Sequence, residues 1–569
     1  MKLFDRRPIY RCLEDFRVAL EASNQLCRIS APISTNLEVT ELHRRVIARG
    51  GPALLLEQAI KADGDASKLP LITNLFGTVR RVAMAIGGED REDLIELGRL
   101  LVELRQPKPP AGLRDALRKW PLARAALTSR PEMVSRPACQ AAIWRNRDID
   151  LGRLPVQTCW PGEPAPLITW PIVITRPPGP VEAASHNWGI YRMQVTGPDS
   201  AIVRWLAHRG GAKHFREWQA RGEPMPIAVA IGADPATLLA AVTPVPETLS
   251  EANFAGLLRG ERTRLAKAVT VPLLVPAEAE IVLEGTVTPG DVALEGPYGD
   301  HTGYYNAAET YPVMRLSAIT TRDNPMYLTT FTGRAPDEPA VLSEALNDVF
   351  LPLVQQQFPE VVDCWLPPEA ASYRIAVISI DKRYPGHARR VMMGLWSMLP
   401  QFNYTKLMII VDDDIDARDW RDVMWAVATR SDAGRDLLVL TDTPIDVLDF
   451  ASPVAGLGGK LGIDATRKIG AETSRLWGDR LVMGPAATQR VDELLQSFSK
   501  LNPGCKPNLF RGLLGTADPV CDKSLSLRLI VNLQRRTGQL QQQLGNLLHC
   551  SAISAPHVVE SIDCVSLER

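Results

Sequence analysis

The stretch Leu167-Ile-Thr-Trp-Pro-Ile-Val-Ile174 gives the first indication of the fold, because it is a short β-rich run. Similar runs recur from about Trp144 to Asn324, where Pro and Gly separate them. Runs of this kind are typical of the strands of a barrel or a sandwich. The middle of the chain is therefore predicted to be β-rich, with further strands at Tyr191–Val195, Ile202–Leu206, Ile227–Ile231, Ala279–Val287 and Val313–Ile319.

The chain that follows alternates strands with a helix. Tyr373–Ile380 and Leu407–Val411 are largely apolar runs, and Leu437–Leu440 is a third. Between the last two runs, apolar residues recur at the i, i+3, i+4, i+7 spacing of one helical face. This order of strand, helix and strand predicts a parallel α/β domain. The residues of the predicted helical face are Trp420, Val423, Met424 and Val427.

The two ends of the chain differ from this middle part. The first ~130 residues mix helical patterns, such as that of Leu94–Leu104, with polar turns, which predicts an N-terminal α/β or α+β lobe, and they hold no nucleotide motif. The C-terminal end holds four of the nine cysteines and a Gln-rich segment, and it is predicted to be a peripheral helix or an appendage. Leu533, Leu540, Leu544 and Leu547 are the residues that would line such a helix. The predicted boundaries are 1–130, 131–325, 326–495 and 496–569.

The composition is that of a globular protein with a large core. The 569 residues are 45% hydrophobic and 23% charged, which excludes disorder, collagen and coiled coil. Lys and Arg total 64 against 65 Asp and Glu, so the net charge of −1 gives no overall field for nucleic acid or an anionic membrane. The charged N-terminus lacks the apolar run of a secretory signal. The odd number of cysteines, without a C-x-x-C pair, is expected of reduced thiols in a cytosol.

Several familiar active sites are excluded by their motifs. The chain lacks H-E-x-x-H, G-x-S-x-G and G-x-x-x-x-G-K-[ST]. The run Gly456–Gly462 is the nearest to a phosphate loop, but it follows Ser452-Pro453 rather than a strand and has no Ser or Thr after its Lys. A structural glycine turn is therefore the favoured interpretation, and a P-loop NTPase is disfavoured.

The densest polar segment is Leu294-Glu-Gly-Pro-Tyr-Gly-Asp-His-Thr-Gly-Tyr-Tyr305. Its carboxylates Glu295 and Asp300 lie on a stretch bent by Gly and Pro, which can aim both at one point. Two carboxylates that repel each other raise the pKa of at least one, and this permits proton donation near neutral pH. The residue types alone leave a solvated turn equally open.

Two upstream segments are rich in groups that bind phosphate and metal. They are Ser185–Arg192 and Arg204–Gly211, where arginine forks and glycine amides suit a phosphate. Asn, His and a carboxylate such as Glu251 form a mixed oxygen and nitrogen set that suits a divalent ion such as manganese better than zinc. Taken singly, His208, Arg204 and Arg209 are more often structural or surface residues.

Together these segments resemble the UbiD family of prenylated-flavin-dependent decarboxylases, and most closely its ubiquinone-pathway branch. The resemblance extends from the N-terminal lobe to about residue 490, whereas the residues beyond about 495 do not resemble the family. It implies a mixed α+β fold. In this fold a flavin-binding split β-barrel is flanked by an N-terminal α/β lobe and by a C-terminal α/β domain that contributes to oligomerisation. Besides the segments above, it rests on Gly232–Thr237, Thr243–Pro246, Phe254–Gly260, Gly333–Pro339 and Asp412–Asp414.

The resemblance also implies roles for individual residues. Arg192, Glu295 and Asp300 would form the acid/base set, with Asp300 as the proton donor. Asn187, His208 and Glu251 would hold Mn2+, and K+ is a second candidate cation. The residues that would bind prenylated FMN are Ile190, Tyr191, Arg192, Arg204, Trp205, Leu206, Arg209 and Gly210.

The activity implied by the resemblance is decarboxylation of 3-polyprenyl-4-hydroxybenzoate to 2-polyprenylphenol and CO2. Loss of CO2 from an aromatic acid leaves an aryl carbanion, for which side chains are inadequate electron sinks and a cofactor is needed. Alternatives are a decarboxylase or carboxylase of a small aromatic or acrylic acid, and a non-catalytic component of quinone synthesis. Expected partners are a flavin prenyltransferase, other quinone-synthesis proteins and further copies of the chain, as a hexamer in relatives. The expected location is the cytoplasm, with peripheral attachment to the inner membrane.

Overall fold

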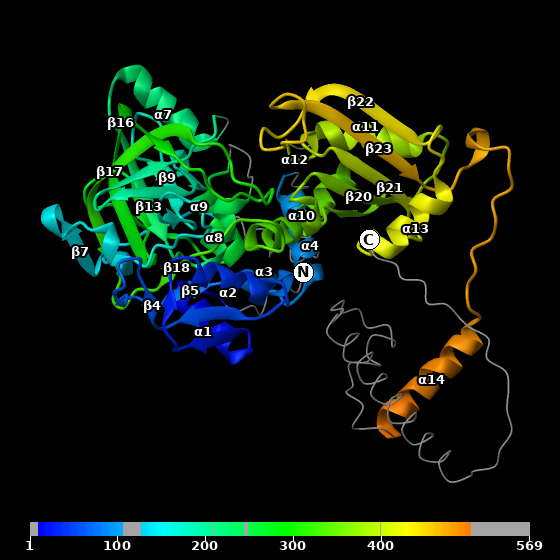
Figure 1. Ribbon diagram of the computed structural model, residues 1–569, viewed down its shortest axis with the longest axis horizontal. Coiled ribbons are helices and arrows are strands. Elements are labelled where there is room, and N and C mark those ends of the chain that lie inside the picture. Colours follow the sequence, from blue (N-terminus) through cyan, green and yellow to red (C-terminus); the bar gives the residue numbers. More distant parts are fainter. Residues whose placement is uncertain (1–8, 106–126, 208, 244–248, 399, 502–569) are drawn as a thin grey trace, which may run out of the picture. The chain divides into compact units, whose positions relative to one another are not determined.

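The computed structural model of the chain describes residues 9–105, 127–207, 209–243, 249–398 and 400–501. Residues up to Trp477 form one compact unit, and a second unit begins at Gly478 (Figure 1). In the second unit the described helix is α14, Pro485–Leu501. The four leucines of the predicted C-terminal helix, Leu533 to Leu547, lie outside the described residues.

The N-terminal lobe is built on a mixed four-stranded sheet in the order β1-β3-β5-β18. β1 and β3 are parallel, β3 and β5 antiparallel, and β5 pairs in parallel with β18 from a distant part of the chain. Helix α1 buries Leu13, Phe16 and Leu20 along one stripe, as the helical repeat requires. The predicted helix at Leu94–Leu104 is confirmed as α4. The elements are α1 Leu13–Ala22, β1 Leu26–Ile29, β2 Ile33–Ser34, α2 Glu38–Ile47, β3 Ala53–Leu56, β4 Ala59–Ile60, β5 Leu71–Thr73, α3 Val79–Ala85, α4 Arg91–Arg105 and β18 Tyr327–Leu328.

The β-rich middle part forms a nine-stranded sheet whose main path is β10-β9-β13-β16-β17-β12-β11-β8, with β7 paired to β17. β16 and β17 form a long antiparallel pair in the middle of this sheet (Figure 1). Among the described strands the path has two free ends, at β10 and β8, so the sheet is not a closed barrel. The strands are β7 Ala142–Arg145, β8 Leu167–Ile168, β9 Ile172–Thr175, β10 Asn187–Ile190, β11 Met193–Gly197, β12 Ser200–Val203, β13 Met225–Ile231, β16 Ile281–Glu295 and β17 Glu309–Thr321.

Three helices and a small sheet accompany these strands. The side chains of Asp234 and Ser250 cap α8 and α9, because each accepts a hydrogen bond from a first-turn backbone N–H. Asp234 also pairs with Arg259 at the end of α9, at 2.6 Å between Oδ2 and Nη2, and ties the two helices together. The elements are β6 Glu132–Met133, α7 Gly210–Arg221, α8 Pro235–Val242, α9 Glu251–Arg259, β14 Arg264–Lys267 and β15 Leu274–Pro276, with 3-10 turns at Ala138–Gln140, Asn146–Asp148, Leu151–Arg153 and Ala183–Ser185.

The C-terminal part of the first unit is a five-stranded sheet in the order β19-β20-β21-β23-β22. β20, β21 and β23 are parallel, as expected of an α/β domain, while β19 and β22 are antiparallel edges. The elements are α10 Glu338–Gln357, β19 Val361–Trp365, β20 Ile375–Ile380, α11 His387–Met398, α12 Pro400–Asn403, β21 Leu407–Asp412, α13 Trp420–Arg430, β22 Leu437–Pro444 and β23 Leu457–Ala465, with 3-10 turns at Pro368–Ala370 and Gly470–Glu472.

Three expectations for this part are corrected. The run at Leu437–Leu440 does not continue the parallel sheet, because β23 lies between β21 and β22. The glycine run is not a turn but most of β23, in which a Cβ on Gly462 would lie 2.5 Å from Met392 Sδ of α11. In α13, Val423 is buried but Met424 is 52% exposed, because the helix buries the side that carries Val423 and Ala426. No helix in the described ranges is long and apolar enough to cross a membrane.

Candidate active site

The predicted acid/base residues meet at the ends of central-sheet strands. Arg192 lies in the short connection between β10 and β11, and Glu295 is the last residue of β16. One edge of the guanidinium donates two hydrogen bonds to the carboxylate, at 2.7 Å between Nε and Oε1 and 3.1 Å between Nη2 and Oε2. Such a two-pronged contact fixes the orientation of both groups. Because Glu295 is fully buried, its charge depends on Arg192.

Asp300 lies on the loop between β16 and β17 and joins this pair from one side. Its Oδ2 lies 3.5 Å from Arg192 Nη1 and 4.0 Å from Arg204 Nη1. Its Oδ1 accepts hydrogen bonds from the backbone and ring of His301, at 2.8 and 2.6 Å. Burial favours the neutral acid, but His301 and Arg192 outweigh it and hold the pKa of Asp300 below its usual range. The structure therefore brings all three predicted residues together.

We call the cluster of Arg192, Glu295 and Asp300 the acid site. Two further residues complete it, and the sequence did not predict either. Asn306 accepts from Arg192 Nη2 at 2.9 Å and from the backbone N–H of Tyr298 at 3.0 Å, so it fixes the guanidinium to the loop. Glu163 accepts from the backbone N–H groups of Cys159 and Gly299, and burial raises the pKa of its carboxyl. Asn306 directly follows the acidic motif, and Glu163 lies between Gly and Pro, which was the available signal.

The residues predicted to bind a flavin cofactor lie on three adjoining segments. Ile190 ends β10, Arg204 to Leu206 follow β12, and Arg209 directly precedes α7, which begins at Gly210. The backbone N–H of Arg204 donates to the carbonyl of Arg192 at 3.3 Å, and this joins the first two segments beside the acid site. Asn187 Nδ2 donates to the hydroxyl of Tyr191 at 3.4 Å.

The start of α7 has the features of an anion site. A Cβ on Gly210 would lie 2.0 Å from Asn187 Oδ1, so only glycine lets the helix start approach β10 this closely. Arg204 Nε and Trp205 Nε1 are buried donors without a hydrogen-bond partner in the described part of the chain. A helix N-terminus with free donors favours a phosphate. These residues therefore fit the phosphate group of a flavin mononucleotide.

The structure describes two of the three predicted metal ligands. Glu251 begins α9, and its Oε2 accepts from the backbone N–H of Trp188, the neighbour of Asn187, at 3.2 Å. Burial raises the pKa of Glu251, so a bound cation would stabilise its carboxylate. His208 lies outside the described residues, and among those described no group of three His, Cys, Asp or Glu side chains could hold a metal. The amide oxygen of Asn187 and the carboxylate oxygens of Glu251 are ligands that suit a hard divalent cation.

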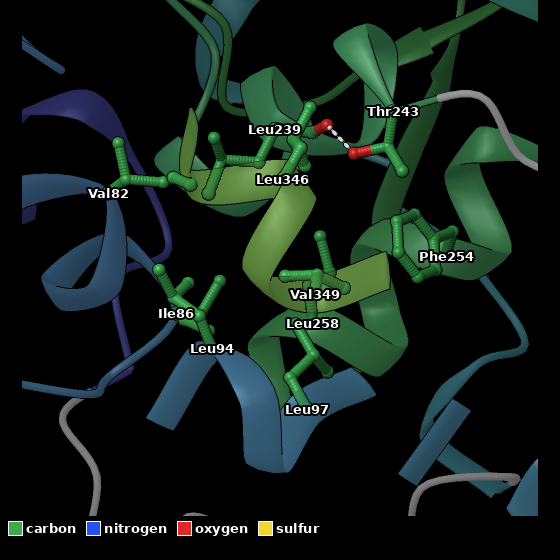
Figure 2. A pocket seen from close by; sticks show the side chains of 11 residues that line it. Val82, Ile86, Leu94, Leu97, Leu239, Thr243, Phe254, Leu258, Leu346 and Val349 are labelled. Carbon is green, nitrogen blue, oxygen red and sulfur yellow. Dashed lines mark hydrogen bonds between the residues drawn. The ribbon is translucent and has the colours of Figure 1, made fainter. Parts of the chain in front are cut away.

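Figure 2 shows an apolar pocket whose lining includes none of the charged residues described above. It is surrounded by α3, α4, α8, α9 and α10, and none of its lining side chains is titratable. Its hydroxyl group, on Thr243, donates to the carbonyl of Leu239 at 2.7 Å. The pocket lining therefore offers no acid, base or charged group. The pocket is lined by Val82, Ile86, Leu94, Leu97, Leu239, Thr243, Phe254, Leu258, Ala345, Leu346 and Val349.

Three family models match the chain in order. They describe the N-terminal, Rift-related and C-terminal domains of UbiD, 3-octaprenyl-4-hydroxybenzoate carboxy-lyase, and they match residues 18–101, 132–335 and 340–465. Together they span the acid site, the start of α7 and the five-stranded sheet.

Solved structures agree with these matches. The UbiD-class enzyme HmfF of Pelotomaculum thermopropionicum, in complex with FMN, is 30% identical over 84% of this chain and 98% of its own, with a TM-score of 0.70. The vanillic acid decarboxylase of Sedimentibacter hydroxybenzoicus, in open form, is 26% identical over 87% and 99%, with a TM-score of 0.72. The 3,4-dihydroxybenzoic acid decarboxylase of Klebsiella pneumoniae, at 22% identity over 84% and 99%, shares the fold with a TM-score of 0.69. With three domain models in order and a 30% identical relative covered almost completely, the chain belongs to the UbiD family.

Proposed function

We propose that the protein is a decarboxylase of aromatic acids that uses prenylated FMN. The observation that carries the proposal is the buried set of Arg192, Glu295 and Asp300 directly beside Arg204, whose Nε has no partner in the described part of the chain. A non-catalytic scaffold has no need of a charged cluster that costs energy to bury. The relatives support the same chemistry, since HmfF is a UbiD-class enzyme solved with FMN and, in an evolved dimeric form, with prenylated FMN.

In this proposal the chain holds the cofactor phosphate with Arg204, Trp205 and the start of α7, while Asn187, His208 and Glu251 hold Mn2+. When bound, prenylated FMN supplies the electron sink that an aryl carbanion requires. Ile190, Tyr191, Leu206, Arg209 and Gly210 complete the proposed binding site, and K+ is a second cation.

The chain's own residues orient the acid and donate the proton. Arg192, fixed by Glu295 and Asn306, turns Nη1 toward Asp300 and offers a positive charge to the substrate carboxylate. Asp300 delivers a proton to the carbon that has lost CO2. The Glu295 side chain is fully buried and those of Arg192 and Asp300 are only 14% and 9% exposed, so little water reaches the cluster to compete for the carbanion.

For the substrate we propose 3-polyprenyl-4-hydroxybenzoate, which gives 2-polyprenylphenol and CO2. The supporting observation is a set of exposed apolar side chains beside the acid loop and next to Asp446: Tyr304 is 67% exposed, Phe450 59%, and Val447 and Val454 58% each. The rings of Tyr304 and Phe450 are in contact, with centroids 6.0 Å apart. A polyprenyl chain would cover these side chains and remove them from water. Peripheral membrane attachment and a homo-oligomer belong to the same proposal.

The second candidate is a decarboxylase or carboxylase of a small aromatic acid without a prenyl chain. It is supported by the relatives named for vanillic and 3,4-dihydroxybenzoic acid. The test is CO2 release by the protein co-expressed with a flavin prenyltransferase, from prenylated and unprenylated 4-hydroxybenzoate, after the bound cofactor has been identified by mass and absorbance. CO2 from the prenylated acid supports the first substrate, and CO2 from unprenylated acids alone supports the second. A fully loaded protein that releases no CO2 from either overturns the proposed function.

A matched pair of variants tests the apolar surface. F450A removes an exposed ring next to Tyr304, so it should raise KM for the prenylated acid several-fold and leave KM for an unprenylated acid unchanged. M424A removes an exposed side chain of α13 and serves as the control. Equal KM values for F450A and M424A would reject this surface as the site of the prenyl chain.

A further inference from the structure

His301 is the residue of the acid loop whose contacts the proposed chemistry leaves unexplained. Its ring Nδ1 and backbone N–H both approach Oδ1 of Asp300, at 2.6 and 2.8 Å. The side chain is 19% exposed, so it is largely withdrawn from water. Because Oδ1 is occupied by His301, only Oδ2 of Asp300 is directed toward Arg192 and Arg204.

The opposite edge of the ring faces a different part of the chain. His301 Nε2 lies 3.1 Å from Arg374 Nη1 and 3.7 Å from Asp446 Oδ2. Arg374 directly precedes β20 and Asp446 follows β22, so both lie at strand ends of the five-stranded sheet. One imidazole therefore joins the acid loop of the central sheet to the C-terminal sheet.

The Asp446 carboxylate is held firmly in this position. Its Oδ2 accepts from Arg374 Nη2 at 2.8 Å and from the Tyr373 hydroxyl at 2.9 Å, and its Oδ1 accepts from the backbone N–H of Leu448 at 3.0 Å. Three donors fix both oxygens, so the carboxylate cannot turn away from His301 without breaking hydrogen bonds.

We infer that His301 is a positioning residue for the proton donor: held by Asp446, which Arg374 fixes in place, it fixes Oδ1 of Asp300 and shares one proton with that carboxylate. The inference rests on the proposed decarboxylation and extends it to residues of the C-terminal sheet. The shared proton passes from Asp300 to the substrate carbon, and solvent water restores it to the pair. Asp446 and Arg374 take part only through His301.

The charges around His301 agree with this role. Asp300 and Asp446 favour the imidazolium, while Arg374 and burial oppose it, and the balance raises the pKa of His301 to about 9. Asp337 also acts on the pair from the start of α10, and Tyr373 presents its ring at 6.4 Å between centroids. Coupled groups of this kind titrate as a pair. We therefore expect the Asp300–His301 pair to keep its proton up to about pH 9.

Three variants separate the two edges of the ring. H301N keeps a donor at the position of Nδ1, and H301Q keeps one at the position of Nε2. D446N removes the carboxylate charge that faces Nε2. The control is D291N, which removes a carboxylate that pairs with Arg315 on the surface. All are prepared as the cofactor-loaded full chain, and absorbance confirms equal loading before any rate is compared.

The first readout needs no turnover. Imidazole 15N resonances of histidine-labelled protein are followed from pH 5 to 10, and the His301 signal among the eight histidines is assigned by its loss in H301N. We expect His301 to titrate near pH 9 in the wild type and in D291N, and about one pH unit lower or more in D446N. Titration near the ordinary pH of 6.5 in the wild type, or no shift in D446N, overturns the inference.

The second readout is the pH profile of kcat for CO2 release. In D446N the alkaline limb should shift to lower pH by the same amount as the His301 titration. In H301Q, which loses the contact to Asp300, kcat at pH 7 should fall about 10²-fold, and in H301N it should fall less. A merely structural residue would lower the rate without moving the limb, and that result overturns the inference. If the loaded wild type titrates as expected but releases no CO2, the proposed function fails and the inference falls with it.

Discussion

The ion pair between Asp234 and Arg259 allows a stability prediction that is independent of the activity. Arg259 Nε and Nη2 donate to Asp234 Oδ1 and Oδ2, at 3.1 and 2.6 Å, and the two side chains are only 5% and 6% exposed. Asp234 also caps α8, since its Oδ1 accepts from the backbone N–H of Thr237 at 3.0 Å. D234A therefore removes a helix cap and leaves a buried guanidinium without its counterion.

The size of the effect follows from these contacts. Loss of an N-cap costs about 1 kcal/mol, and removal of one partner of a buried ion pair costs about 3–5 kcal/mol. We expect D234A to lower the free energy of unfolding by about 4–6 kcal/mol in urea titrations followed by tryptophan fluorescence. The matched control is D419A, because exposed Asp419 caps α13 through the backbone N–H of Arg421, and it should cost only about 1 kcal/mol.

A double variant identifies the cause. D234A/R259L removes the buried charge together with its partner. It should therefore recover most of the free energy of unfolding that D234A loses, except the part that comes from the helix cap. The reasoning is refuted if D234A costs no more than D419A, or if the double variant is as unstable as D234A. Since α9 begins at Glu251, D234A should also weaken metal binding, which calorimetry with Mn2+ can measure.

Three further outcomes are expected. D300N should lower kcat for CO2 release about 10²–10⁴-fold with cofactor absorbance unchanged, since the proton donor is lost; a drop below tenfold would exclude that role. Burial raises the pKa of Glu338 to about 7, above its unfolded value, so the protonated form stabilises the fold at low pH and this stability is lost as pH rises through 7. In the wild type the free energy of unfolding, measured by urea titration, should therefore fall between pH 4.5 and 7, and E338Q should remove about 3 kcal/mol of this fall. An equal fall in E338Q and the wild type would contradict this. G210A should abolish cofactor absorbance, because its Cβ would lie 2.0 Å from Asn187 Oδ1, whereas G434A, with no contact under 3.4 Å, should keep it.

The site was only partly predictable. Arg192, Glu295 and Asp300 stand in motifs dense with charge, Gly and Pro, and the structure brings them together. Asn306 lies just after the acidic motif and Glu163 between Gly and Pro, but their partners are distant in sequence, and only the folded structure brings Asn306 to Arg192 and Glu163 to the backbone of Gly299. The partners of His301 Nε2 lie at strand ends of a different sheet, and no local spacing indicates such a contact.

What the sequence by itself determined was local. Apolar runs and their period predicted the strands of the central sheet and the helix at Leu94–Leu104, because burial of one face repeats along a helix or strand. The tertiary structure decided which strands become neighbours. β23, read from sequence as a glycine turn, pairs with β21 because its glycines leave room for α11, and this displaces β22 to an antiparallel edge. Strand order and contacts such as that between His301 and Asp446 depend on packing between distant segments, which composition and spacing do not encode.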